Sequence, residues 1–233
     1  MTAGGEQAVG EMQVALAHCA RLCASQPVRA EEQAAEILRV VPGHPEALRL
    51  LALARRRRGD AAGSAAVLRA LVQSQPDWAS AHYELGLTLT ALHDQAAAIT
   101  AFARAAKLRP QFSEAWSALG QALILAGDAA GADRAFARQI AAATRDPRLI
   151  EAATALCDDR LDMAERLLRP HLKTFPADIA AIRMLAEVGT RLGQYADAEL
   201  LLERCLELAP TFTAARHNYA IVLYRQNLSL IHI

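Results

Sequence analysis

Proline residues recur at a fixed distance along this chain, and that spacing limits the folds that the chain can adopt. Pro42, Pro76 and Pro110 are evenly spaced at intervals of about 34 residues, and Pro176 and Pro210 have the same separation. Between the prolines, apolar residues follow the i, i+3, i+4, i+7 spacing of an amphipathic helix rather than the alternation of a strand. Units of this length, each holding two helices, predict an array of stacked helix pairs.

The segment 79–112 shows the pattern most clearly. Leu85, Gly86 and Leu89 predict one face of a first helix, Ala98 and Phe102 predict one face of a second, and residues 91–94 form the turn between them. Gly86 and Ala98 are small where the two helices must cross closely, so we expect Phe102 to fill the space beside them. The same pattern recurs one repeat length later, at Trp116, Leu119, Gly120, Leu123, Ala132 and Phe136.

A helix pair that recurs at this interval, with small and large residues at fixed offsets and a closing proline, resembles the tetratricopeptide repeat (TPR). The resemblance implies an all-α fold, a right-handed α-solenoid of helix-turn-helix repeats. In a solenoid each repeat packs only against its neighbours. Such a fold serves as a binding scaffold for many partners, so it indicates a class of function and not a particular one.

The repeat boundaries divide the chain into an arm, a solenoid and a tail. We predict a flexible N-terminal arm at residues 1–10, followed by a first helix at about 12–24 and a second at about 29–40. The solenoid is predicted to span residues 11–227, with repeats at about 11–44, 45–78, 79–112, 113–146, 147–178 and 179–212, and a partial repeat at 213–227.

The fifth repeat departs from the spacing. Pro176 follows Pro110 two residues too early for two full repeats, and the first helix, expected at 148–157, lacks the glycine of its neighbours. We therefore expect this helix to be short and the superhelical angle to change there.

The seventh repeat is incomplete. Its first helix is predicted to reach about Arg225, and residues 228–233 neither cap a helix nor continue the repeat. We predict that this tail is non-native or truncated, and that the natural protein continues beyond Asn227.

Composition excludes several classes of partner. The 25 basic and 25 acidic residues balance, so net charge gives no argument for nucleic acid or an anionic membrane. No apolar run approaches the length of about 18 residues that a membrane span requires, and the N-terminus lacks the pattern of a secretory signal. Four cysteines without disulfide spacing favour a reducing compartment, so we expect a cytoplasmic protein.

Three clusters of functional residue types have simpler explanations than a site. His18, Cys19 and Cys23 supply too few ligands for a metal, so we interpret the thiols as core residues. The basic run Arg55–Arg58 precedes a glycine, where cations stabilise a helix end. The acidic residues within 158–165 lack the central glycine of a calcium loop and fit a capped turn. No catalytic, cofactor-binding or metal-binding residue is predicted.

The remaining candidate is the concave surface, which the first helices of the repeats line in this family. Its mixture of polar and aromatic side chains suits an extended peptide or a neighbouring domain, although plain solvent exposure explains any single residue equally well. The pair of Lys and Asn that grips a chaperone's C-terminal carboxylate in some members is absent. The predicted partner-binding residues are Arg49, Arg56, Tyr83, Thr90, Gln121, Arg183, Glu187, His217 and Tyr224.

A narrower resemblance concerns residues 164–227, and the runs 180–187 and 215–226 carry most of it. This segment is similar to the N-terminal repeat region of bacterial TPR-containing sulfotransferases. In that family a C-terminal catalytic domain uses the donor 3′-phosphoadenosine 5′-phosphosulfate (PAPS). No residue of that domain is present here, so the resemblance assigns no cofactor to this chain.

Three hypotheses follow. The first is a protein-interaction scaffold that binds a protein or peptide in its groove. The second is the non-catalytic region of a sulfotransferase whose catalytic domain follows in the same polypeptide. The third is self-association through the apolar face of the unfinished repeat, which presents Tyr219, Ile221, Leu223 and Tyr224.

Overall fold

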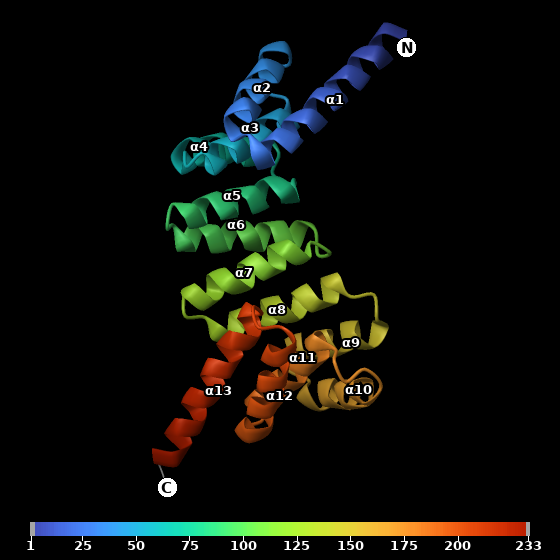
Figure 1. Ribbon diagram of the computed structural model, residues 1–233, viewed down its shortest axis with the longest axis vertical. Helices are drawn as coiled ribbons and strands as arrows, with labels where there is room; N and C mark the ends of the chain where they lie inside the picture. Colours follow the sequence, from blue (N-terminus) through green and yellow to red (C-terminus); the bar gives the residue numbers. More distant parts are fainter. Residues whose placement is uncertain (1–2, 232–233) are drawn as a thin grey trace. The chain divides into compact units, whose positions relative to one another are not determined.

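The computed structural model describes residues 3–231, and the side chains of residues 10–226 within them. These residues form thirteen α-helices and no strand (Figure 1). The prediction of an all-α helical-repeat fold is therefore confirmed. The chain divides into two compact units, residues 1–108 and 109–233, which are described separately.

The first unit holds three helix pairs in which each helix packs against the next along the chain. The first helix of each pair also contacts the first helix of the following pair, as expected for stacked repeats. The helices are α1 (Ala3–Ser25), α2 (Pro27–Val40), α3 (Pro45–Arg57), α4 (Ala61–Ser74), α5 (Ala79–Ala91) and α6 (Gln95–Leu108).

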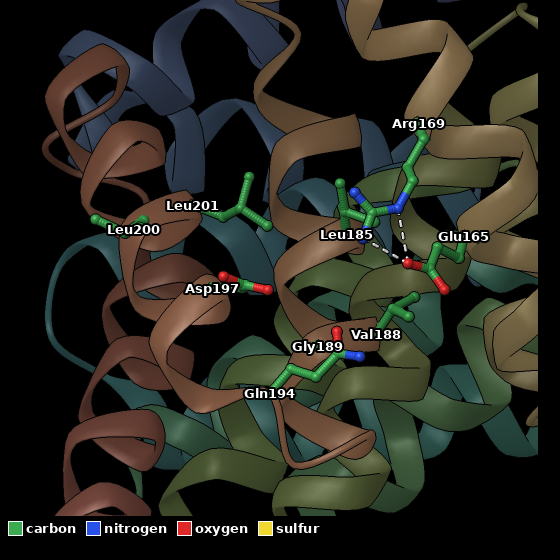
Figure 2. A pocket seen from close by; sticks show the side chains of 9 residues that line it. All are labelled: Glu165, Arg169, Leu185, Val188, Gly189, Gln194, Asp197, Leu200 and Leu201. Atoms are coloured by element: carbon green, nitrogen blue, oxygen red, sulfur yellow. Dashed lines mark hydrogen bonds and ion pairs between the residues drawn. The ribbon is translucent and has the colours of Figure 1, made fainter.

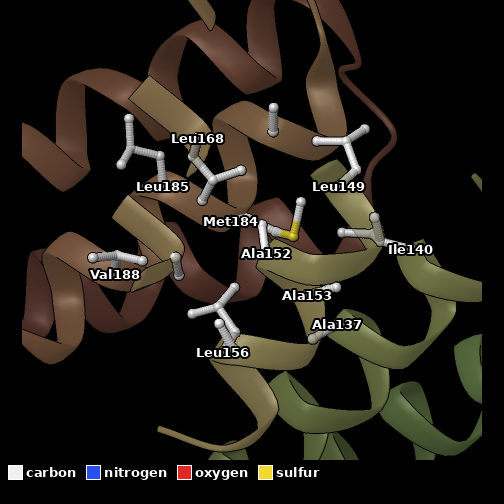
Figure 3. Close-up of a cluster of buried hydrophobic side chains, with 13 residues drawn as sticks. Ala137, Ile140, Leu149, Ala152, Ala153, Leu156, Leu168, Met184, Leu185 and Val188 are labelled. Carbon is white, nitrogen blue, oxygen red and sulfur yellow. The ribbon is translucent and has the colours of Figure 1, made fainter. Parts of the chain in front are cut away.

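The second unit holds three further pairs and a single final helix. Its helices are α7 (Ser113–Leu125), α8 (Ala129–Ala143), α9 (Pro147–Cys157), α10 (Leu161–Thr174), α11 (Ile179–Arg191), α12 (Tyr195–Leu208) and α13 (Thr213–Ile231). Its largest apolar cluster joins α8, α9, α10 and α11, with Ile140, Leu156, Leu168 and Met184 buried against one another (Figure 3). Burying such side chains contributes about 1.5–3 kcal/mol each, which fixes these helices in place.

Glycine and phenylalanine form a matched pair in two of the repeats. A Cβ atom added at Gly86 would lie 2.5 Å from the Phe102 ring, and one added at Gly120 would lie 2.6 Å from the Phe136 ring. Both rings are almost fully buried. The predicted filling of the space beside Gly86 by Phe102 is confirmed.

In five of the six helix pairs, the turn between the two helices places one residue in the left-handed region. Gly59, Gly127 and Gly193 supply it with φ of 90°, 81° and 76°, but His93 and Asp159 occupy the same position with φ of 59° and 58°. Residues other than glycine adopt this region at a cost, because Cβ approaches the backbone carbonyl. The five positions are evenly spaced except between Gly127 and Asp159, which are two residues closer.

The short fifth repeat is confirmed, since α9 has 11 residues where α7 has 13 and α8 has 15. In this unit α11 contacts α8, and α13 contacts both α11 and α7, although α13 is far from α7 in the sequence. Ala214 of α13 packs in one cluster with Ala132 and Phe136 of α8. These contacts place α13 over side chains that the sequence assigned to an open groove.

Both ends of the solenoid differ from the prediction. Helix α1 begins at Ala3, so the segment expected to be a flexible arm is helical from residue 3. Helix α13 continues to Ile231, beyond its predicted end near Arg225. Neither segment contains a proline, and each continues a helix that tertiary contacts already hold. Residues 232–233 of the predicted tail lie outside the described residues.

Candidate functional site

In the first unit, the two predicted groove arginines belong to an ion cluster. Arg49 of α3 lies 2.6 Å from Glu46 and 3.6 Å from Glu84 of α5, and Arg56 lies 2.7 Å from Glu84. All four of these side chains are half-buried or less exposed. These ion pairs link the first helices of consecutive repeats. Arg49 and Arg56 therefore already have acidic partners within the chain.

Two further groove residues lie on α5. The Tyr83 ring packs against Phe102, with ring centroids 5.9 Å apart. Thr90 is exposed, and its hydroxyl donates a hydrogen bond of 3.0 Å to the Gly86 carbonyl oxygen. Tyr83 is therefore partly a core residue, whereas Thr90 faces solvent at the end of the helix.

In the second unit, two predicted groove residues are not at the surface. The side chains of Arg183 and Glu187 on α11 are 0% and 1% exposed. The expectation that they line an open groove is wrong for the described structure, because α8 and α13 both pack against α11. Arg183 lies over the Phe136 ring of α8, at 6.0 Å from its centroid.

These buried side chains form a polar network. Arg183 Nη1 donates to Glu187 Oε2 at 3.0 Å, and Arg191 donates to Glu187 Oε1. Burial raises the pKa of Glu187 to about 7, although the two arginines oppose this shift. Two nitrogen atoms of Arg183, Nε and Nη2, are buried without a partner among the described residues. The network therefore keeps a charge in the interior at a cost in stability.

Helix α13 contributes Asn218 to this network through a contact with α8. With its amide nitrogen facing α8, Asn218 donates hydrogen bonds of 3.2 Å to Asp133 Oδ1 and to the Ala214 carbonyl oxygen. Burial raises the pKa of Asp133, and Arg183 and Arg191 oppose this shift. His217 is half-buried, with Nε2 enclosed, while Tyr224 is 64% exposed further along the same helix.

An open polar pocket of about 610 Å³ borders this network, and we call it the α13 pocket. Five helices of the second unit contribute to it, and α8, α11 and α13 supply most of its charged side chains. It is lined by Ala129, Ala130, Asp133, Arg134, Cys157, Asp159, Thr190, Arg191, Tyr195, Ile221 and Arg225.

Two other hollows flank the second unit. One of about 460 Å³ includes the exposed side chain of Gln121 together with Phe136 and Phe212. The other, of about 300 Å³, lies between α10, α11 and α12, where Arg169 and Glu165 form an ion pair beside Leu185 (Figure 2). Gln121, one of the predicted partner-binding residues of this unit, thus lines an open hollow.

In the first unit, an apolar hollow of about 750 Å³ lies between α1 and α2. Met12, Leu16 and Ile37 line it, and Val40 at its edge is 71% exposed. Glu36 beside it is already paired with Arg39. Nothing in the described chain indicates what would cover this hollow.

The cysteine cluster, the basic run and the acidic segment noted in the sequence all form contacts within the fold. The thiols of Cys19 and Cys23 are buried and face the carbonyl oxygens of Ala30 and Leu50, at 3.3 and 3.7 Å. In the basic run, Arg55 and Arg58 pair with Glu31. In the acidic segment, Asp158 pairs with Arg160, Asp159 with Arg191 and Glu165 with Arg169.

Within residues 3–231, no group of three or more His, Cys, Asp or Glu side chains is placed to hold a metal ion. None of the helices in that part of the chain is both long and apolar enough to cross a bilayer.

Sequence reasoning missed most of the α13 pocket. Asp133 and Arg134 lie on α8 and Tyr195 lies on α12. Both are second helices of their repeats, whereas the predicted groove comprises residues of first helices only. These residues reach the pocket because the start of α13 packs against α8 (Figure 1). The two-residue shortening of the fifth repeat was the one available signal that the following helices would be placed differently.

Comparison with known families identifies the class of protein. A family model described as tetratricopeptide repeat matches residues 19–81 and 83–147, which is more than half of the chain. A second tetratricopeptide repeat model matches residues 184–212. The chain belongs to the tetratricopeptide repeat family. No curated protein matches it.

Solved structures of similar fold have diverse titles. MamA is 20% identical, with 77% of this chain and 86% of that chain covered and a TM-score of 0.53. Naa15/Naa10 bound to HypK-THB is 16% identical, with 91% and 39% covered and a TM-score of 0.56. The human IFIT1 dimer with PPP-AAAA is 18% identical, with 85% and 55% covered and a TM-score of 0.51. At these identities the likeness shows the fold alone.

Proposed function

We propose that this chain is a protein-interaction scaffold whose α13 pocket binds a peptide segment of a partner protein. The observation that carries the proposal is the pocket itself, an open hollow of about 610 Å³ to which five helices contribute. Peptide-binding surfaces combine apolar contacts with a few polar groups that fix orientation. Ile221, Tyr195 and Thr190 supply that mixture beside three arginines and two aspartates.

Several predicted groove residues fit this proposal less well than the pocket does. Arg49 and Arg56 are already paired, and Arg183 and Glu187 are buried. Thr90, Gln121 and Tyr224 remain exposed and could extend a binding surface in their own units. His217 would act through the position of α13 rather than through contact with a partner.

A blocking substitution tests the proposal. Peptides are selected from a phage-displayed random library on the immobilised chain, and their affinities are measured by fluorescence anisotropy. Ala130→Trp places a large side chain in the pocket at an exposed position near the start of α8. We expect it to weaken binding about tenfold or more, since one indole excludes a well-fitting ligand.

The matched control is Ala96→Trp, the exposed residue one repeat earlier that occupies the same place in its helix pair. Its affinity is expected to stay within about twofold of the unmodified chain. If no peptide is selected, or if Ala130→Trp binds as tightly as Ala96→Trp, the proposed function is wrong.

The sulfotransferase alternative stays a prediction that rests on the runs 180–187 and 215–226. Its test is the genomic reading frame after Asn227, where a glycine-rich loop between a strand and a helix would support it. A PAPS site would then belong to that additional domain. We also propose a cytoplasmic location, on the basis of four cysteines that are all free thiols.

A further inference from the structure

The α13 pocket contains more cations than its own carboxylates can engage. Arg134 of α8, Arg191 of α11 and Arg225 of α13 line it, together with Asp133 and Asp159. These five residues come from four different segments of the second unit, which tertiary packing gathers around one hollow.

Both carboxylates already have partners. Asp159 lies 3.5 Å from Arg191, which also donates a hydrogen bond of 2.9 Å to the Leu156 carbonyl oxygen and another to Glu187. Asp133 accepts a hydrogen bond from Asn218 in the buried network. The Arg191 guanidinium thus already contacts Asp159, Glu187 and the Leu156 carbonyl oxygen, which leaves it less able to bind a ligand.

The other two guanidinium groups are free. Arg134 and Arg225 are exposed, and neither forms an ion pair or a side-chain hydrogen bond with any other described residue. They project from α8 and α13, and the start of α13 packs against α8 through Ala214 and Ala132. The pocket therefore presents two unpaired cations on adjacent helices beside a hollow large enough for a side chain.

We propose that the α13 pocket selects a peptide with an acidic side chain, whose carboxylate binds between Arg134 and Arg225. This inference rests on the proposed function, because it names the chemistry of the peptide that the same pocket binds. Guanidinium groups bind carboxylates through paired, charge-assisted hydrogen bonds that a lysine or a neutral side chain does not reproduce. Ile221 and Tyr195 provide apolar contact for the flanking residues of the peptide.

The experiment uses the selected peptides and two double variants of the full chain. Arg134→Ala with Arg225→Ala removes the free cations, and Arg138→Ala with Arg216→Ala removes two exposed arginines of the same helices that do not line the pocket. Each peptide is also made with glutamine for glutamate and asparagine for aspartate. Thermal melting of both variants confirms that the fold is kept.

We expect selected peptides to be rich in Asp and Glu. Their affinity should fall about tenfold or more on loss of Arg134 and Arg225, and by a similar factor with the amide peptide. The control pair should change it by about twofold or less. Binding should also weaken with added salt, because the groups are exposed.

Two results would overturn the inference while leaving the proposed function intact. One is a set of peptides that Ala130→Trp blocks but that carry no acidic residue. The other is a set of acidic peptides that bind equally well to both double variants. Failure to select any peptide that Ala130→Trp blocks would instead remove the proposed function and, with it, this inference.

Discussion

The pairing of glycine with phenylalanine predicts a strong energetic coupling between Gly86 and Phe102. Gly86→Ala would place a Cβ atom 2.5 Å from two carbons of the buried Phe102 ring. Overpacking of this kind costs up to about 3 kcal/mol, and the higher helix propensity of alanine returns about 1 kcal/mol. We therefore expect Gly86→Ala to destabilise the chain by about 1–2 kcal/mol.

The chain itself shows the compensating change. In the sixth repeat Ala186 and Leu202 occupy the corresponding positions, and both are fully buried in one cluster. In the Phe102→Leu background the ring that opposes the new Cβ is gone. Gly86→Ala should then stabilise the chain by about 1 kcal/mol, as helix propensity alone predicts.

The assay is a double-mutant cycle by urea denaturation, followed by far-ultraviolet circular dichroism. The expected coupling between the two substitutions is about 2–3 kcal/mol. Gly10→Ala serves as a control, because a Cβ at this exposed helical position meets nothing within 4 Å. If Gly86→Ala costs the same in both backgrounds to within about 0.5 kcal/mol, the steric explanation is refuted.

Three further predictions concern stability. The pKa of Glu187 is about 7 in the fold, against a model-compound value of 4.5. The folded state therefore binds the Glu187 proton more tightly than the unfolded state does. This stabilises the fold fully below about pH 4.5, and the stabilisation is lost as pH rises through about 7. Glu187→Gln should therefore reduce the decline in unfolding free energy between about pH 5 and 8 by about 3 kcal/mol, and an unchanged decline would contradict this. His93→Gly should raise the melting temperature, with a gain of about 1 kcal/mol from relief of the left-handed backbone, and a lower melting temperature would argue against strain there. Asp128→Ala removes the 2.8 Å hydrogen bond that the Gly131 backbone N–H donates to Asp128 at the start of α8. The unfolding free energy measured by chemical denaturation should fall by about 1 kcal/mol. Stability equal to that of the unmodified chain would show that the cap is dispensable.

Helix positions could be predicted because they depend on local rules. Apolar spacing, the turn position and the closing proline each constrain a few neighbouring residues, and the structure places helices where these signals agree. Phe102 beside Gly86 could also be predicted, since the crossing of two helices within one repeat follows from their sequence alone.

The groove could not be predicted to the same extent, because it depends on contacts between distant repeats. Arg183 and Glu187 have the polarity and helical position of groove residues, yet α8 and α13 cover them. Nothing in the sequence distinguishes Arg134 and Arg225 as binding residues, because isolated arginines on helices are usually solvated. Their placement in one pocket depends on the packing of α13, which a local pattern does not encode.

The most direct test of the peptide-binding scaffold is hydrogen–deuterium exchange of the chain with and without a selected peptide. We expect slower exchange in the segments that line the α13 pocket, residues 129–134 of α8 and 221–225 of α13. Slower exchange confined to α10 and α12, around the hollow shown in Figure 2, would contradict it.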